Sequence, residues 1–279
     1  GGYSLTADAI TDSLKAEGLL SSANSTYKPG AGGSVGLGAF QEIKGKPEAA
    51  MVTGIAMTGG LYSNKSKLNL LDSTPIAKIL REYDGVVVPA SSKYRTLKQL
   101  LDDLVAKPNG VAIAGGSKGG IDHQVIGLLA QKASIDPTKL NYVVYSGGPE
   151  VITSLLSGST QVGISGALDF APYVASGKLR YLGVSSAKPL TGIKAKTFVS
   201  QGYDLVYGNW RGIMAPADLS KADYLNFVKV IDIMHASPAW AAQLKKNNWD
   251  NEFVAGTAFK TFLEKHIPEI NGVMKGLGI

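Results

Sequence analysis

The chain contains no cysteine, which excludes disulfide bonds, zinc sites built from thiolates and cysteine nucleophiles. It has only three histidines, His123, His235 and His266, and their spacing matches no metal-binding motif. No apolar run approaches the roughly 18 residues of a membrane-spanning helix. The 28 Lys and Arg residues outnumber 22 Asp and Glu, but they are scattered, unlike the basic face of a nucleic-acid-binding protein. We therefore expect a globular protein that binds no nucleic acid, metal or cofactor.

Short β-like runs alternate with amphipathic helical patterns along the chain, which predicts an α/β fold with parallel strands. The expected strands are residues 51–53, 86–88, 111–114, 142–145 and 162–165. Thr96 is expected to cap a helix that stops before Pro108. A C-terminal helix is expected to bury one apolar face, formed by Tyr224, Phe227, Val228, Ile231 and Met234.

Two similar segments, "VVVPA" at 86–90 and "IMAPA" at 213–217, are each an apolar strand closed by Pro-Ala. We interpret them as crossover strands between two lobes. Lobe 1 is then discontinuous and comprises residues 1–88 and 212–279, and lobe 2 comprises residues 89–211. A two-strand hinge of this kind predicts a cleft that closes on a ligand. One continuous doubly wound domain is the alternative.

Five glycine-rich junctions punctuate the pattern. They are "GGYSLT" at 1–6, "PGAGGSVG" at 29–36, "GGSKGG" at 115–120, "SGGPE" at 146–150 and "SGALD" at 165–169. The last three follow an expected strand and precede an expected helix, where an α/β sheet binds its ligands. Glycine lets the backbone approach a ligand closely, and the next helix offers N–H donors at its positive end. These loops therefore predict an anion-binding site.

The glycine loops do not match the nucleotide-binding motifs. Ile121-Asp122 stands where a phosphate-binding P-loop needs Lys and Ser or Thr, and Val35 stands where a dinucleotide fingerprint needs its third glycine. Several weak cradles instead suit a small anion with more than one charged end, such as a di- or tricarboxylate.

Residues 115–119 also fit the G-x-S-x-G elbow of an α/β serine hydrolase, with Ser117 as nucleophile. Such an enzyme needs a later histidine in a loop, whereas His235 and His266 lie in helical patterns. The hydrolase is therefore the alternative function, and a non-enzymatic binding protein is favoured.

The chain resembles the periplasmic substrate-binding proteins of tripartite tricarboxylate transporters from Gly1 to the C-terminus. The motifs that carry the resemblance, in family order, are "GGYSLTADAI", "KPGAGGSVGLG", "AGGSKGGIDH", "YVVYSGGPEVITSLLSG", "GISGALDF", "SGKLRYLGVSS" and "NWRGIMAP". The resemblance implies a two-lobed Venus-flytrap fold and a carboxylate such as citrate, held by backbone amides. It also implies an exported, periplasmic protein that delivers its ligand to integral membrane subunits. We further expect the protein to be a monomer.

Two features depart from the family pattern. The strand that commonly precedes the first glycines is missing, so we expect a processed or truncated start. Ser4 and Asp8 stand where the family commonly has Asp and Arg. Arg211 is expected near the cleft or on the surface. The residues expected to line the ligand site are Gly2, Tyr3, Ser4, Gly32, Gly33, Thr53, Gly116, Ser117, Gly119, Gly120, Asp122, Ser165 and Gly166.

Overall fold

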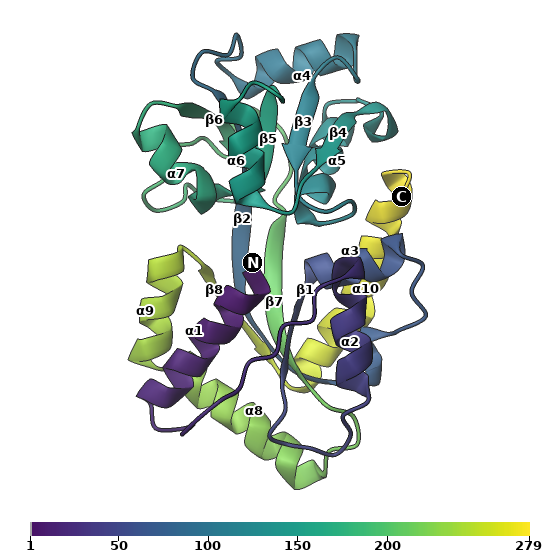
Figure 1. The fold of residues 1–279 in the computed structure, drawn as a ribbon, viewed down its shortest axis with the longest axis vertical. Coiled ribbons are helices and arrows are strands. Elements are labelled where there is room, and N and C mark those ends of the chain that lie inside the picture. Colours follow the sequence, from purple (N-terminus) through teal and green to yellow (C-terminus); the bar gives the residue numbers. More distant parts are fainter. Residues whose placement is uncertain (1) are drawn as a thin grey trace. The chain divides into compact units, whose positions relative to one another are not determined.

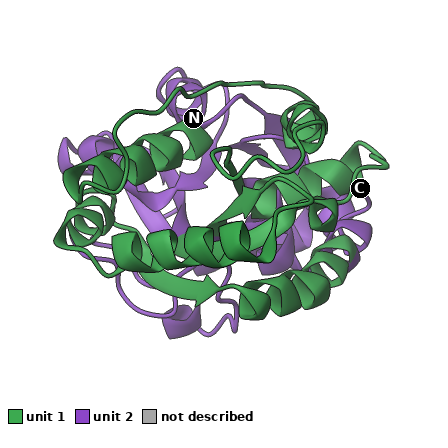
Figure 2. Ribbon diagram, turned by 90° about the horizontal axis from the view of Figure 1, so that it is seen from below, with its two compact units in different colours: residues 1–81, 210–271 green, residues 82–209, 272–279 purple. Residues whose placement is uncertain are grey.

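The computed structural model describes residues 2–279, in which the chain divides into two compact units (Figure 2). Unit 1 comprises Gly1–Arg81 and Trp210–Asn271, and unit 2 comprises Glu82–Asn209 and Gly272–Ile279. Gly1, which belongs to the first glycine motif, lies outside the described residues. The divisions fall at 81/82 and 209/210, whereas the sequence suggested 88/89 and 211/212, and the last eight residues group with unit 2.

The helices of unit 1 come from two parts of the chain, residues 2–63 and 221–276 (Figure 1). Its helices are α1 (Gly2–Ala16), α2 (Ser34–Gln41), α3 (Ile55–Ser63), α8 (Lys221–His235), α9 (Pro238–Asn247) and all but the last turn of α10 (Thr257–Gly276), with short 3-10 helices η1 (Ala31–Gly33) and η2 (Leu70–Asp72). Its strands are β1 (Met51–Gly54), β8 (Asp250–Ala255) and parts of β2 (Thr74–Pro89) and β7 (Gly208–Ala215). The long strands β2 and β7 contain the apolar parts of the two similar segments, end at or just before their Pro-Ala pairs, and each include residues of both units.

The strand pairs described in unit 1 are antiparallel, which corrects the expectation of a parallel sheet. β1 pairs with β7 through Met51↔Met214, and β2 pairs with β8 through Ala77↔Ala255. β7 is the neighbour of β2 in the sheet order. The alternation of strands and helices therefore identified the α/β class correctly, but it predicted the wrong strand direction for this unit.

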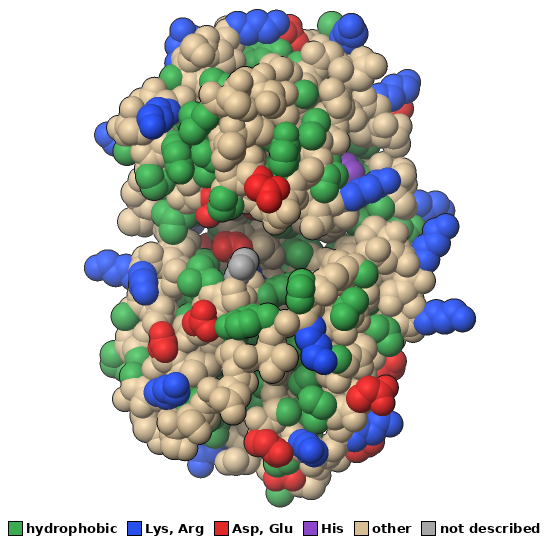
Figure 3. All heavy atoms as spheres, in the orientation of Figure 1, with side chains coloured by type: hydrophobic (Ala, Val, Ile, Leu, Met, Phe, Trp, Pro, Cys, Tyr) green, Lys and Arg blue, Asp and Glu red, His purple; other side chains and the backbone are tan. Residues whose placement is uncertain are grey.

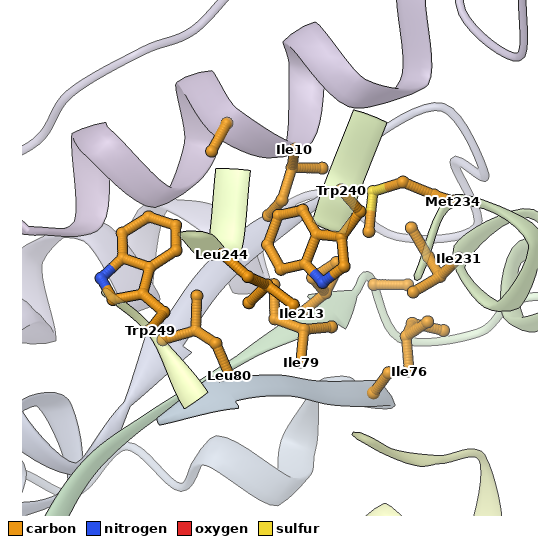
Figure 4. Packing of buried hydrophobic residues seen from close by; sticks show 13 residues of the cluster. Ile10, Ile76, Ile79, Leu80, Ile213, Ile231, Met234, Trp240, Leu244 and Trp249 are labelled. Carbon is orange, nitrogen blue, oxygen red and sulfur yellow. The ribbon is translucent and has the colours of Figure 1, made fainter. Parts of the chain in front are cut away.

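The core of unit 1 is formed by side chains from α1, β2, β7, α8 and α9 (Figure 4). Trp240 at the start of α9 is fully buried, and Trp249 packs near it with ring centroids 6.3 Å apart. Ile231 and Met234 of α8 join this cluster, and Tyr224, Phe227 and Val228 pack against it. The predicted apolar face of the C-terminal helix is therefore confirmed as core.

Unit 2 contains the repeated strand–helix units that the sequence predicted. Its elements, besides its parts of β2 and β7, are α4 (Leu97–Ala106), β3 (Ala112–Gly115), α5 (Ile121–Lys132), η3 (Pro137–Lys139), β4 (Asn141–Val144), α6 (Gly148–Leu156), β5 (Val162–Gly166), α7 (Ala167–Ala175), β6 (Leu179–Val184) and η4 (Val199–Gln201). Thr96 caps α4, as the sequence predicted, and the structure adds a capping box with Gln99.

The sheet of unit 2 is mixed. β3 pairs in parallel with β4 and β5, and the connection after each of these strands is followed by a helix. β2 pairs antiparallel with both β5 and β6. The parallel part of the sheet therefore brings the three loops 115–120, 146–150 and 165–169 to the carboxyl ends of its strands.

The C-terminal residues join unit 2 because they pack on α5. Gly127 has no side chain, and a Cβ there would collide with the side chain of Leu277. Gln131 also donates to the carbonyl oxygen of Gly276, at 3.3 Å. A small residue inside a helix thus makes room for the end of the chain, which the periodicity of apolar residues did not indicate.

None of the helices in residues 2–279 is long and apolar enough to cross a membrane. On the face drawn in Figure 3, Lys and Arg side chains are dispersed over the surface of each unit instead of gathering into one basic patch.

Candidate functional site

In unit 1, the predicted ligand residues at the start of α1 lie beside the start of α3. The hydroxyl oxygen of Tyr3 accepts a hydrogen bond from the backbone N–H of Met57, at 2.9 Å. Gly54 lies next to Tyr3, because a Cβ at position 54 would be 3.3 Å from the tyrosine ring and 2.6 Å from the carbonyl oxygen of Trp210. Tyr3 therefore takes one of the free N–H donors in the first turn of α3.

Arg211 on β7 belongs to the same group. Its side chain is 5% exposed, its Nη1 donates to Thr6 Oγ1 at 2.8 Å, and its guanidinium lies 5.6 Å from the ring centre of Tyr3. Gly2 makes this position possible, because any Cβ there would collide with the guanidinium. A cation beside the first turn of α1 adds to the positive end of the helix dipole, so this corner of unit 1 favours an anion.

The predicted loop around Gly32 and Gly33 packs closely on α3. Both glycines have positive φ, 63° for Gly32 and 101° for Gly33, which other residues rarely adopt. A Cβ on Gly60 of α3 would lie 2.6 Å from the Cα of Gly32, so the two backbones touch. The glycine pattern here serves loop packing, and its contact with a ligand stays a prediction.

Two other predicted residues of unit 1 differ in exposure. Ser4 is partly exposed in the first turn of α1, whereas Thr53 is fully buried on β1 and donates from Oγ1 to Met57 Sδ at 3.5 Å. Thr53 therefore supports the same turn of α3 that bonds to Tyr3.

We expect Gly60→Ala to lower the free energy of unfolding by about 1–3 kcal/mol, because the new methyl group overpacks against the Gly32 loop. Gly272→Ala is the matched control, since Gly272 is also helical and a Cβ there meets nothing within 4 Å. That control is expected to stabilise the protein by about 0.5–1 kcal/mol through backbone entropy. Urea titrations followed by circular dichroism measure both. Equal effects of the two changes would show that the loop does not pack on α3.

In unit 2, side chains of the same unit form hydrogen bonds with several backbone groups of loop 115–120. The Gly116 N–H donates to Asp122 Oδ2 at 2.7 Å, and the Gly119 N–H donates to His123 Nδ1 at 3.2 Å. Tyr142 and Gln124 donate to the carbonyl oxygens of the same two glycines. The loop is thereby fixed, and its exposed tip is Ser117 and Lys118.

Gly120 closes the same loop by donating from its N–H to the carbonyl oxygen of Ser117, at 2.8 Å. Of the predicted residues 116, 117, 119, 120 and 122, Ser117 is the exposed one, and Asp122 is buried with 8% exposure. The structure thus brings these residues into one loop, in which Asp122 orders the backbone. A direct contact of Asp122 with ligand stays a prediction.

The other two loops of unit 2 converge on Asp169 at the start of α7. Ser165 Oγ donates to Asp169 Oδ2 at 3.0 Å, and a Cβ on Gly148 would lie 2.5 Å from the same oxygen. Gly166 is also close, with a Cβ position 3.4 Å from Asp169 Oδ2. The predicted residues Ser165 and Gly166 therefore surround a carboxylate of the protein, near the first turns of two helices.

A buried pair of carboxyl groups lies behind loop 115–120. Asp84 on β2 is 2% exposed, and its carboxyl group lies beside the buried carboxyl group of Asp122. Burial raises the pKa of Asp84 well above its ordinary value, and the charge of Asp122 raises it further. Burial also raises the pKa of Asp122, to about 6, although the Gly116 N–H and Asp84 favour its charged form.

The histidines do not support the hydrolase alternative. Burial, and then the charge of Lys118, lower the pKa of His123 to about 4, and its Nδ1 already accepts from Gly119. Its ring stacks on Tyr142 with centroids 4.1 Å apart. His235 stacks on Phe253 in the same way, and His266 bonds to Glu269 through Nδ1. Each histidine thus has a local structural role.

Sequence reasoning missed Asp84 and left the place of Arg211 open. The signal for Asp84 was present, because a carboxylate directly before the apolar run "GVVVP" is expected to be buried if that strand is central. Arg211 gave a weaker signal, since "NWRG" fits a surface position equally well. Asp122, the neighbour of Asp84, and Thr6, the partner of Arg211, are both far from these residues in the sequence.

Glycine-rich loops at the carboxyl ends of strands are typical of α/β proteins that bind small ligands. The sequence model described as "Tripartite tricarboxylate transporter family receptor" matches residues 22–278. The chain therefore belongs to this family, as the order of its motifs predicted. Family members of this kind are receptors and not hydrolases, in agreement with the favoured function.

Two curated relatives are similar in sequence. A UPF0065 protein of Bordetella bronchiseptica is 26% identical over 227 residues, which cover 77% of this chain and 64% of the relative. A UPF0065 protein encoded in the tcbD-tcbE intergenic region of Pseudomonas sp. is 23% identical, covering 68% of this chain and 57% of the relative. The chain thus spans less than two thirds of the length of these relatives.

Solved structures share the fold. The structure of R. palustris Rpa4515 with adipate has a TM-score of 0.83 at 16% identity. The match covers 99% of this chain and 93% of the Rpa4515 chain. MatC from Rhodopseudomonas palustris with bound malate has a TM-score of 0.78 at 14% identity, covering 97% and 93%. A TctC solute binding protein from Polaromonas has a TM-score of 0.76 at 20% identity, covering 99% and 94%. The α/β fold of a solute-binding protein is thereby confirmed.

Proposed function

We propose that this protein is the periplasmic receptor of a tripartite transporter. It captures a small carboxylate and delivers it to integral membrane subunits, as a monomer and without a cofactor. The family and the fold support this function, and two proteins of similar fold are described with malate and adipate. That the ligand lies between two lobes remains part of the proposal.

The observation that carries the proposal is the buried guanidinium of Arg211 beside the first turn of α1. Desolvating a carboxylate costs several kcal/mol, and one helix terminus contributes only about 0.3–1 kcal/mol. A carboxylate site therefore needs several charge-assisted hydrogen bonds, each contributing about 1.5–3 kcal/mol. A fixed guanidinium supplies two of them in the geometry that fits a carboxylate.

We assign the ligand contacts to the predicted residues of both units. Gly2, Tyr3 and Ser4 act with Arg211 in unit 1, and the exposed Ser117 acts in unit 2, where Ser165 joins it through its backbone. Gly32, Gly33 and Thr53 in unit 1, and Gly116, Gly119, Gly120, Asp122 and Gly166 in unit 2, shape these contacts through the loops that they order.

The charge of unit 2 bears on which carboxylate is bound. Its loops already hold the carboxylates of Asp122 and Asp169, which repel a second anion nearby. A dicarboxylate carries fewer negative charges than citrate and therefore meets less repulsion from these carboxylates. We therefore propose a dicarboxylate as the preferred ligand and citrate as the weaker one.

Thermal-shift measurements test this function with malate, adipate, citrate, glucose and ATP. A carboxylate at 100 times its Kd adds about 2.7 kcal/mol to the stability, which raises the melting temperature by about 5–10 °C for a chain of this size. The dimethyl ester of malate is the matched control, because it keeps the carbon skeleton and lacks the charges. A shift with glucose and none with the carboxylates would refute the proposed function.

A further inference from the structure

Asp84 is held in place by the sheet of unit 2. Its backbone N–H donates to Ser185 Oγ at 3.0 Å, and its carbonyl oxygen accepts from the Ser185 N–H at 2.9 Å. On the other side it pairs with Gly166 of β5. These hydrogen bonds fix the backbone of Asp84, so its side chain cannot move away from Asp122 unless hydrogen bonds of the sheet break.

The Asp84 side chain has an unusual environment. Its Oδ2 is buried, and no hydrogen-bond donor of residues 2–279 reaches it. The group it faces is the carboxyl of Asp122, and the further charges that act on it are Glu82 and Asp169. A carboxylate oxygen only accepts hydrogen bonds, so two ionised carboxylates in this position repel each other. One proton between them turns this repulsion into a hydrogen bond.

The two members of the pair differ in their surroundings. Asp122 lies in the first turn of α5 and accepts from the Gly116 N–H at 2.7 Å, and both the helix end and this donor favour its negative charge. Asp84 has neither. The proton therefore resides on Asp84, which donates to Asp122, and Asp122 in turn holds Gly116.

We propose that Asp84 is a positioning residue, which shares one proton with Asp122 and thereby holds loop 115–120 in the conformation that receives ligand. The part that concerns ligand rests on the proposed function. The remaining contacts of the loop come from His123, Gln124 and Tyr142. Tyr142 stays protonated, because burial and the two aspartates raise its pKa well above its ordinary value.

The pair makes the loop depend on pH in a defined direction. Both carboxyl groups have a higher pKa in the folded chain than in the unfolded chain, where Asp titrates near pH 4. Their contribution to stability is therefore complete below about pH 4 and is lost as the pH rises through about 6 and above. His123 does not titrate in that upper range, because its pKa is about 4.

Asp84→Asn tests the shared proton, because the amide donates to Asp122 at every pH and carries no charge. Between pH 5.5 and 8, the melting temperature of the ligand-free wild-type protein is expected to fall further than that of this variant. The extra fall is about 3–5 °C for each tenfold by which the pair binds its proton more tightly in the folded chain than in the unfolded chain. Asp102→Asn, which removes an exposed acid on α4, is the control and is expected to keep the wild-type slope.

Hydrogen exchange of the Gly116 amide reports on the loop itself. After correction for base catalysis, its protection in the wild-type protein is expected to fall about tenfold from pH 5.5 to 8 and to stay constant in Asp84→Asn. Asp122→Asn is the reciprocal variant, because its amide donates to Asp84 and its oxygen still accepts from Gly116. It is expected to remove the pH slope too, and it decides the question if Asp84→Asn does not fold.

Titration with malate and adipate adds the functional consequence. Affinity of the wild-type protein is expected to fall over the same pH range, and affinity of Asp84→Asn is expected to stay level. Wild-type slopes of melting temperature and Gly116 protection in both variants would overturn the shared proton. A level wild-type affinity would overturn its role in ligand binding. Failure of both acids to bind wild-type protein counts against the proposed function, and the ligand-free measurements still decide on the proton.

Discussion

Replacing Trp240 with alanine is expected to lower the free energy of unfolding by about 3–5 kcal/mol. Trp240 is fully buried, and side chains from α1, β2, β7 and α8 surround it (Figure 4). Removing the indole leaves a cavity that these elements cannot fill without moving, because strands and helices on several sides fix their positions. Urea denaturation followed by circular dichroism measures the loss, which is a large part of the stability of an ordinary domain.

Leu225→Ala is the control for Trp240→Ala. Leu225 lies on α8, which packs on the same core, but its side chain is 54% exposed. Its removal is expected to change the stability by less than about 0.5 kcal/mol. If the two variants unfolded at the same urea concentration, α8 and α9 would not pack around Trp240 as described.

Local signals predicted much of unit 2. The cap at Thr96 and the glycines after β3, β4 and β5 are each readable within a few residues, and each is confirmed. Local patterns work here because parallel strands need a helix to return the chain, so every strand is followed by a recognisable change of period.

The sheet of unit 1 was predicted less well, for a physical reason. β1 pairs with β7, about 160 residues later in the chain, and β2 pairs with β8. Nothing near β1 indicates the direction of a partner so distant in the sequence, and a strand of four residues looks alike in either orientation. The docking of Leu277 on Gly127 was missed for the same reason, because a glycine inside a helix is only locally unfavourable.

The candidate site shows the same division between local and distant information. Glycine motifs located the loops. They did not show that Asp122 and His123 already accept hydrogen bonds from N–H groups of loop 115–120, or that Asp169 lies close to the backbone of the other two loops. Side chains can fill an anion cradle as well as a ligand can, and a motif alone does not distinguish the two. Arg211 in unit 1 and Asp84 in unit 2 lie on strands outside the five glycine-rich junctions, so those motifs did not point to them.

Arg211→Met is expected to weaken the binding of malate and adipate about 30- to 4,000-fold, which corresponds to the roughly 2–5 kcal/mol lost when one partner of a buried charge pair is truncated. Methionine has a similar length and fills the buried space on β7, so the protein is expected to keep its fold. The donors and the charge disappear together, and the ligand carboxylate then remains desolvated without its partner. Isothermal titration calorimetry measures the affinity, and circular dichroism verifies the fold.

Two further variants separate the guanidinium from charge in general. Arg211→Lys keeps the charge but loses the paired donors, and we expect an affinity between those of the wild-type protein and Arg211→Met. Arg95→Met removes an exposed positive charge in unit 2 and is expected to leave the affinity within about twofold, because surface charges are screened by salt. Equal binding of malate by Arg211→Met and Arg95→Met would show that Arg211 only supports α1 through Thr6, and the carboxylate would then have to be bound by backbone donors and serine hydroxyls alone.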